Sequence, residues 1–192
     1  MIADSPHPLV ALDRALLLLM LAALAAVLTG ALVLQLAFGE IPCPLCLLQR
    51  VVMLGVCFGL VRQLHALGSG SGSERGGGLA LLCAVLLLVI SARQTLLDIV
   101  PRPGHAYVGT AVLGLHMPVW SVVIAVALIL GFAVRLAVFG GARSASGRPR
   151  GRPARLTRWL ELYVLLLCAL NFVAVVAQCG VGECHTDGYR LL

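Results

Sequence analysis

Hydrophobic residues in this chain gather in five long runs that are separated by polar stretches. The runs cover residues 15–38, 44–62, 79–97, 118–138 and 159–178. Each is close to the roughly 20 apolar residues that a helix needs to cross the hydrocarbon core of a bilayer. Inside lipid every backbone amide needs a partner within its own segment, so each run is predicted to be helical. The pattern predicts an all-α membrane protein with five transmembrane helices.

Composition supports a membrane location. The chain has 192 residues, of which 60% are hydrophobic and only 11% charged, which is more apolar surface than a soluble domain of this size can bury. Membrane lipids are therefore expected partners. The first run, Ala15 to Phe38, is too long for the hydrophobic part of a signal peptide, and no small-residue cleavage site precedes Glu40. We expect it to remain as a helix.

The positions of the arginines predict the orientation. A cytoplasmic N-terminus places ten arginines inside, namely Arg14, Arg62, Arg75, Arg135, Arg143, Arg148, Arg150, Arg152, Arg155 and Arg158. It leaves four outside, namely Arg50, Arg93, Arg102 and Arg190. The positive-inside rule then predicts a cytoplasmic N-terminus and a periplasmic C-terminus. Because the charge of +6 is gathered between apolar runs, it indicates membrane orientation, and no nucleic-acid partner is expected.

The polar stretches differ in character. Residues 66–78 are rich in glycine and serine and are expected to form a flexible linker. Residues 139–158 are rich in arginine, glycine and proline and are expected to lie disordered or on anionic headgroups. Neither is expected to be catalytic. The outer segments, residues 39–43, 98–117 and 179–192, are where chemistry is expected.

The seven cysteines fall into two groups. Cys43, Cys46, Cys179 and Cys184 lie at the predicted outer face, where disulfides persist. This placement agrees with the orientation derived independently from charge. The other three, Cys57, Cys83 and Cys168, stand inside apolar helices, and we interpret them as packing residues.

The segment around Cys43 and Cys46 carries the strongest chemical signal. Cys43 occupies a helix N-cap position, Pro44 suits the first helical position, and Cys46 follows within the first turn. Free N–H groups and the helix dipole at that end favour an anion. A thiolate there is expected to be stabilised and to act as a good leaving group in disulfide exchange. A C-x-x-C pair alone also occurs in zinc sites and structural bridges.

Arg50 lies on the same helix face as the two cysteines, at i, i+3 and i+7 spacing. Placing an arginine near the membrane interior costs free energy, so we expect this residue to have an anchoring or functional role. One is anchoring at the interface by snorkelling. The other is stabilisation of negative charge on a neighbouring electron acceptor or thiolate.

Three motifs together resemble the disulfide bond formation protein B (DsbB) family of membrane quinone reductases. They are residues 43–50, CPLCLLQR; residues 91–94, SARQ; and residues 114–120, GLHMPVW. The combination is far more specific than C-x-x-C alone, and the similar region spans residues 15–139.

The resemblance implies a four-helix bundle in the bacterial inner membrane, with an interfacial segment between the third and fourth helices. It implies that Cys43 and Cys46 are the quinone-coupled redox pair, with Arg50 at the quinone and Arg93 also facing it. The cofactor would be ubiquinone or menaquinone. The partner would be a soluble periplasmic thioredoxin-fold oxidase similar to DsbA, which the protein reoxidises.

The chain departs from the family in its second outer loop and in its C-terminal part. Residues 98–117, where the family carries a second cysteine pair, contain no cysteine. We divide the chain into a DsbB-like domain, residues 1–139, a basic cytoplasmic loop, residues 140–158, a fifth helix, residues 159–178, and a periplasmic tail, residues 179–192. Our hypothesis is that the fifth helix returns a shuttle pair, Cys179 and Cys184, to the outer face.

Several alternatives remain open. Cys179 and Cys184 are flanked by glycines that let them meet or reach the first pair, but they are also compatible with a purely structural bridge. His185 is expected either to activate Cys184 or to have no role. The outer cysteines with His185 could instead form a soft-metal site of a Zn, Cu or Hg transporter or sensor. A vitamin K epoxide reductase-like enzyme fits less well, because its redox pair lies on a later helix.

Overall fold

The computed structural model describes residues 8–69, 74–99, 114–139 and 155–180. The helices are α1, Pro8–Ala37; α2, Pro44–Ser69; α3, Arg75–Ile99; α4, Met117–Phe139; and α5, Arg155–Cys179. All five are long and apolar enough to span a membrane, and the described residues contain no strand. The prediction of an all-α membrane protein with five spanning helices is confirmed.

Two boundaries differ from the expected ones. Residues 66–69 and 75–78 were expected in a flexible linker, but they extend α2 and α3. Of the glycines here, Gly76 lies where the backbones of α2 and α3 approach closely, because an added Cβ would lie 2.8 Å from the Gly59 carbonyl oxygen. The expected basic loop, the interfacial segment and the tail lie mainly at residues 140–154, 100–113 and 181–192, which are outside the described residues.

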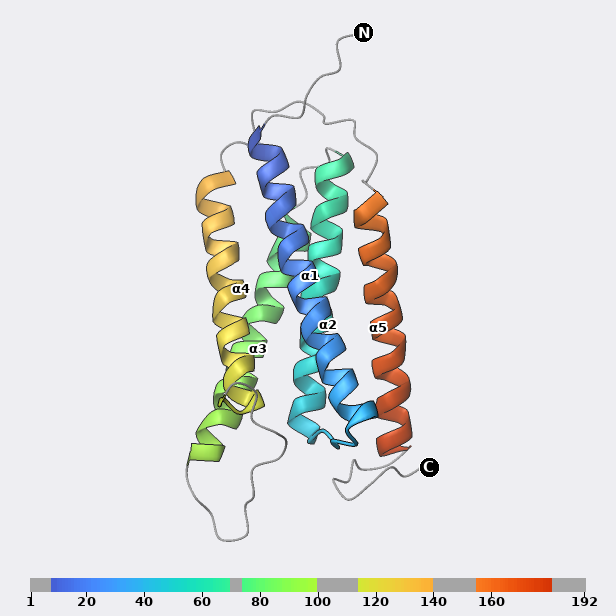
Figure 1. The fold of residues 1–192 in the computed structure, drawn as a ribbon. Helices are drawn as coiled ribbons and strands as arrows, with labels where there is room; N and C mark the ends of the chain where they lie inside the picture. The colour runs from blue at the N-terminus through green and yellow to red at the C-terminus, as the bar shows by residue number, and fades with distance from the viewer. Residues whose placement is uncertain (1–7, 70–73, 100–113, 140–154, 181–192) are drawn as a thin grey trace.

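The helices form an antiparallel bundle (Figure 1). Each helix runs opposite to the one before it, so α1 begins and α5 ends at opposite ends of the bundle. The largest contacts are between α2 and α3 and between α3 and α4, whereas α5 packs against α1 and α2. This arrangement agrees with the predicted four-helix bundle that carries an additional fifth helix.

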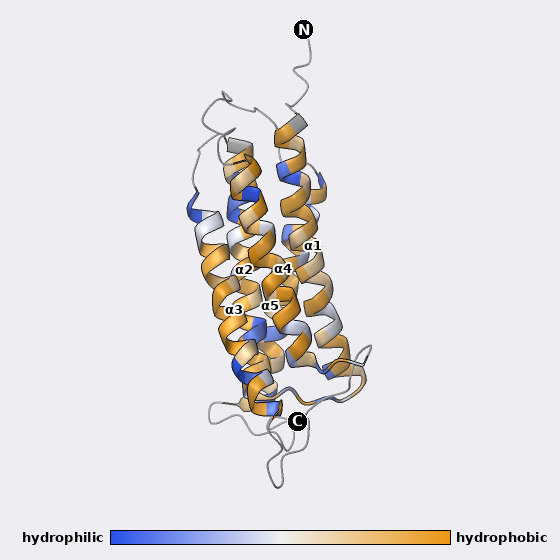
Figure 2. Cartoon of the chain, turned by 90° about the vertical axis from the view of Figure 1, so that its left-hand side faces the viewer, coloured by the Kyte–Doolittle hydropathy of each residue, from blue (hydrophilic) through white to orange (hydrophobic). Residues whose placement is uncertain are grey.

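The core and the lipid-facing surface are both apolar. Leu17, Leu21, Leu24 and Leu28 recur every three or four residues along α1 and are fully buried, as expected for one face of a helix. Large side chains on other faces, such as Phe172, are exposed. Figure 2 shows hydrophobic colouring along the middle of the bundle and hydrophilic colouring nearer its ends. This distribution suits a chain whose solvent is lipid.

Small residues let α2 and α3 approach each other closely. A Cβ atom added to Gly59 would lie 2.7 Å from the backbone nitrogen of Ala80 and 2.8 Å from the carbonyl oxygen of Gly76. Such close approach of backbones is a common means of helix association in membranes, because burying apolar surface there contributes little free energy to association. Gly59 is therefore required by packing.

We expect Gly59→Ala to lower the thermal unfolding temperature in detergent, because backbone atoms of α3 must move away. Gly78→Ala is the matched control, since a Cβ there meets no atom within 4 Å. Alanine is the better helix former by up to about 1 kcal/mol, so the control should be neutral or stabilising. Equal unfolding temperatures for the two variants would contradict this account.

A buried ion pair joins α1 and α4 at the end predicted to be cytoplasmic. The Asp13 carboxylate accepts a hydrogen bond of 2.7 Å from Arg135 Nε, and both residues are at most 2% exposed. Nearby, the Gln63 side-chain oxygen accepts the backbone N–H of Gly77 at 2.9 Å. Arg135 was counted among the orienting arginines, yet its charge is compensated inside the bundle.

Removing one partner of this pair should be strongly destabilising. We expect Asp13→Leu to cost about 3–5 kcal/mol, because it leaves a buried guanidinium without its carboxylate. The double variant Asp13→Leu/Arg135→Met removes both charges and should recover most of that loss. Unfolding in a graded detergent mixture measures both, and a double variant as unstable as the single one would argue against charge compensation.

Candidate active site

The short connection between α1 and α2 places Cys43 at the N-terminus of α2. Gly39 has a positive φ of 69°, which lets the chain leave α1 and turn. The Leu47 N–H bonds to the Cys43 carbonyl oxygen, which makes Cys43 the N-cap residue. The Cys46 N–H also donates to the Cys43 sulfur at 3.2 Å, as an N-cap side chain accepts. The predicted N-cap position is confirmed.

Cys43 and Cys46 form a pair of free thiols whose side chains hydrogen-bond to each other. That hydrogen bond, together with burial, raises the pKa of the Cys43 thiol, although two backbone N–H groups act in the opposite direction. The thiolate expected at this helix end is therefore disfavoured at Cys43 while both sulfurs are reduced. The physical reason is that two neighbouring sulfurs compete for one negative charge, and Cys43 keeps its proton.

An amide from α3 contacts both sulfurs. Gln94 Nε2 lies 3.4 Å from the Cys43 sulfur and 3.5 Å from the Cys46 sulfur, and it donates to each. Gln94 is buried, and it stands within the motif of residues 91–94. Sequence reasoning considered its neighbour Arg93 instead. Arg93 is exposed and is not among the residues that line the cavity described next.

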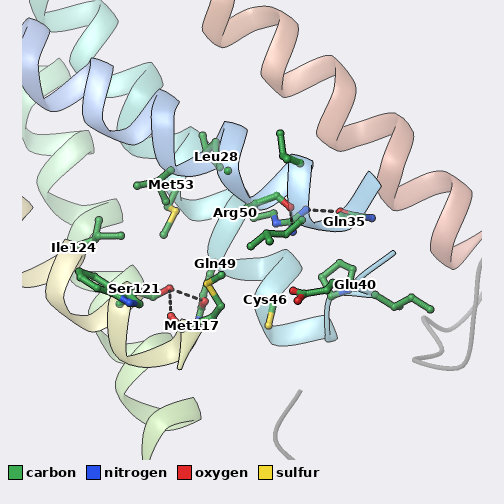
Figure 3. Close-up of a pocket in the computed structure, with 18 of the residues that line it drawn as sticks. Leu28, Gln35, Glu40, Cys46, Gln49, Arg50, Met53, Met117, Ser121 and Ile124 are labelled. Carbon is green, nitrogen blue, oxygen red and sulfur yellow. Dashed lines mark hydrogen bonds between the residues drawn. The ribbon is translucent and has the colours of Figure 1, made fainter. Parts of the chain in front are cut away.

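A cavity of about 830 Å³ lies beside Cys46 (Figure 3). It is enclosed by α1, α2, α4 and the connection between α1 and α2. Its wall is mostly apolar, and its polar members include Cys46, Arg50, Gln35, Gln49, Ser121 and Glu40. Gly30 and Val33 of α1 also line it and are exposed, so the cavity borders the lipid-facing surface. Cys43 is not part of this wall.

Arg50 is fixed in the wall of this cavity by α1. Its guanidinium donates to the side-chain oxygen of Gln35 and, at 3.0 Å, to the carbonyl oxygen of Ala31. It is half-buried on the same face of α2 as Cys46, as the spacing predicts. The structure thus brings Arg50 and Cys46 to one cavity.

Several residues of the cavity wall were missed by sequence reasoning. They are Gln35, Gln49, Ser121 and Trp120. The available signal was their chemistry, because isolated glutamines within hydrophobic runs are expensive in lipid unless they find partners. Periodicity alone did not show which of them faced one another.

The C-terminal end of α5 lies against the segment that precedes Cys43. Gln178 Nε2 donates to the Pro42 carbonyl oxygen at 2.8 Å, and Gln178 is only 1% exposed. The next residue, Cys179, is buried and disulfide-bonded. Gly180 has a positive φ of 62° and ends the helix. Cys184 and His185 lie outside the described residues.

Three further polar contacts hold the first third of α5, between Thr157 and Tyr163. Arg14 of α1 donates to the Thr157 hydroxyl at 3.0 Å, and the Thr29 and Tyr163 hydroxyls lie 2.6 Å apart. His65 Nε2 of α2 lies 3.0 Å from the Glu161 carboxylate. Together with Gln178, these contacts fix the position of α5 along its own axis relative to α1 and α2.

The remaining cysteines are separate from the pair. Cys57 is fully buried in the core, and Cys83 packs against Gly55, as the packing interpretation predicts. Cys168 is exposed on α5 and so contacts the surroundings of the bundle rather than its core. In the part of the chain that the structure describes, no three His, Cys, Asp or Glu side chains gather as a metal site would require.

Fold and site define a class of protein: a helical membrane protein with a vicinal dithiol at a helix N-terminus beside a lipid-bordering cavity. Comparison with known proteins points to one family. Residues 13–106 match the model of the family "Disulfide bond formation protein DsbB". That segment contains α1 to α3 with Cys43, Cys46, Arg50 and Gln94.

Two curated relatives are each named "Disulfide bond formation protein B". The one from Chromobacterium violaceum is 38% identical over 111 residues, covering 55% of this chain and 64% of the relative. The one from Chromohalobacter salexigens is 35% identical over 100 residues, covering 48% of this chain and 55% of the relative. The matched segments thus span less than two thirds of either relative. No solved structure matches the chain.

Through this segment the chain is similar to the DsbB family. With its five spanning helices, it is a multi-pass protein of the bacterial inner membrane. The match ends at residue 106, before α4 and α5.

Proposed function

We propose that this protein is a membrane thiol–disulfide oxidoreductase that transfers electrons from a periplasmic dithiol protein to a membrane quinone. The donor would be a thioredoxin-fold oxidase similar to DsbA, which is thereby reoxidised. The observation that carries the proposal is the cavity shared by Cys46 and Arg50, next to the N-cap thiol of Cys43. The match of residues 13–106 to the DsbB family supports it.

The cavity suits a quinone head group. A quinone has a flat ring with apolar faces and two carbonyl oxygens that accept hydrogen bonds. The wall offers apolar side chains such as Met53 and Ile124, the ring of Trp120, and Arg50 as a cationic donor. Because the cavity borders the exposed face of α1, a lipid-soluble ligand can enter from the membrane. The donor set therefore fits the cofactor that the family implies.

Transfer within the protein is a sequence of disulfide exchanges. A thiolate of the donor attacks the Cys179 disulfide, and the second donor thiol completes the exchange, so the donor leaves as a disulfide and the tail pair is reduced. A tail thiolate then attacks Cys43 of the Cys43–Cys46 disulfide and releases Cys46 as a thiolate. The second tail thiol resolves this mixed disulfide, which leaves Cys43 and Cys46 reduced.

In this proposal the two exchange partners would approach the pair from different sides. Cys43 adjoins Pro42, the residue that α5 contacts, while Cys46 lines the cavity. Arg50, in the same wall, favours negative charge that develops beside it. A bound quinone would accept the two electrons and two protons released when the Cys43–Cys46 disulfide forms again. The direction of transfer is then set by the reduction potentials of the successive pairs.

The first test is quinone reduction by the purified protein with a reduced thioredoxin-fold protein as donor. We expect Cys43→Ser, Cys46→Ser and Cys179→Ser each to lower the rate at least 100-fold, because each breaks the chain of exchanges. Cys168→Ser, which changes an exposed thiol on α5, is the control and should retain the wild-type rate. Full activity in Cys179→Ser would remove the tail from the pathway, and full activity in Cys43→Ser would refute the proposal.

A second test concerns the docking of α5. We expect Gln178→Leu to slow donor-dependent quinone reduction about two- to tenfold, the usual value of one buried hydrogen bond, because the end of α5 that carries Cys179 is less well held against the segment preceding Cys43. With dithiothreitol, which reduces the Cys43–Cys46 disulfide directly, the rate should stay unchanged.

The matched control is Asn171→Leu. Asn171 is also a buried amide on α5, but its side chain donates to the Leu167 carbonyl of its own helix. This variant should therefore retain the donor-dependent rate. A Gln178→Leu variant that is equally slow with both donors would show a general loss of structure and would contradict the positioning role.

A further inference from the structure

The Gln94 amide is placed so that one nitrogen serves both sulfurs of the redox pair. An amide nitrogen carries two hydrogens, and the Cys43 and Cys46 sulfurs lie 3.4 and 3.5 Å from Gln94 Nε2. Sulfur is a weak acceptor as a thiol and a much better one as a thiolate. The amide is thus directed at atoms that become charged during disulfide exchange.

The orientation of this amide is fixed by two other helices. The Gln94 side-chain oxygen accepts a hydrogen bond of 2.8 Å from Gln49 Nε2 of α2. The Gln49 oxygen in turn accepts the Ser121 hydroxyl of α4 at 3.0 Å, a contact drawn in Figure 3. If Gln94 alone were reversed, two NH₂ groups would face each other and its oxygen would face the sulfurs. The network therefore favours the donor side towards the pair.

The buried surroundings of Gln94 strengthen its hydrogen bonds to the sulfurs. Gln49, Gln94 and Ser121 are each at most 7% exposed, so water does not compete strongly with the amide. Hydrogen bonds to charged groups are stronger than neutral ones, and more so where the local dielectric is low. A thiolate formed here loses hydration and needs donors from the protein.

We propose that Gln94 is a catalytic residue whose amide N–H groups stabilise the thiolate released when the Cys43–Cys46 disulfide is opened, with Gln49 and Ser121 as the residues that orient it. The inference rests on the proposed function. In that step the bond between the attacking sulfur and Cys43 forms, the Cys43–Cys46 bond breaks, and the electron pair goes to the Cys46 sulfur. Gln94 lowers the energy of this leaving group and of the transition state that leads to it.

The test measures the thiolate directly, without quinone or donor protein. The reduced full-length protein in detergent is treated with iodoacetamide at pH 7 and at pH 10, and modification of Cys43 and Cys46 is followed by mass spectrometry. Only the thiolate reacts. We expect Gln94→Met to slow alkylation of the pair about tenfold at pH 7, the effect of one lost charged hydrogen bond, and to approach the wild-type rate at pH 10.

Two companion variants make the result decisive. Ser121→Ala leaves Gln94 in place and removes only its indirect support, so a smaller fall of about two- to threefold at pH 7 is expected. Gln63→Met is the matched control, because Gln63 is an equally buried glutamine that binds the Gly77 N–H at the other end of α2. It should alkylate at the wild-type rate. Arg50 and Glu40, the charged side chains of the cavity wall, are unchanged in all variants.

Two outcomes would overturn the inference. One is a wild-type rate at pH 7 in both Gln94→Met and Ser121→Ala. The other is a fall of equal size at pH 7 and pH 10, which would indicate altered access to the sulfurs instead of altered ionisation. The assay contains no electron acceptor, so its result does not depend on the proposed relay. Failure of quinone reduction would refute the proposed function, and the alkylation rates would still decide the role of Gln94.

Discussion

Lipid offers no hydrogen bonds, and this constraint decides how the polar side chains of the bundle are arranged. A buried amide, hydroxyl or charge must find its partner within the protein, because leaving it unpaired costs free energy. At one end of the bundle Asp13 and Arg135 satisfy each other across α1 and α4. At the other end the amides of Gln49 and Gln94 pair across α2 and α3. These contacts specify how the helices meet, which apolar packing in lipid leaves largely open.

The asymmetry between Cys43 and Cys46 comes from their position at a helix start. Cys43 is the N-cap residue and adjoins the connection that α5 contacts, whereas Cys46 is one turn inside the helix and lines the cavity. Two sulfurs three residues apart thus belong to different surroundings. In the proposed function one exchanges with protein thiols and the other faces the electron acceptor. Gln94 is the group that contacts both.

The fifth helix is integrated with the bundle. Besides apolar packing, it makes polar contacts that run from Thr157 near its start, which binds α1, to Gln178 near its end, which binds the connection between α1 and α2. A helix held only by apolar contacts could slide or rotate in lipid, but directional hydrogen bonds at both ends permit one register. That register brings Cys179 beside the segment leading to Cys43. The absence of a cysteine pair from residues 98–117 makes this location relevant to the proposed relay.

The sequence by itself determined the five helices, the candidate redox pair and the resemblance to the DsbB family, because hydrophobic run length and the motif of residues 43–50 are local properties. It also predicted the N-cap role of Cys43 and the shared face of Cys46 and Arg50, since helix periodicity relates residues within one element. Only the tertiary structure showed that Gln94, and not Arg93, reaches the sulfurs. Such contacts join residues on different helices, and they depend on helix rotation and register, which the packing of the whole bundle decides.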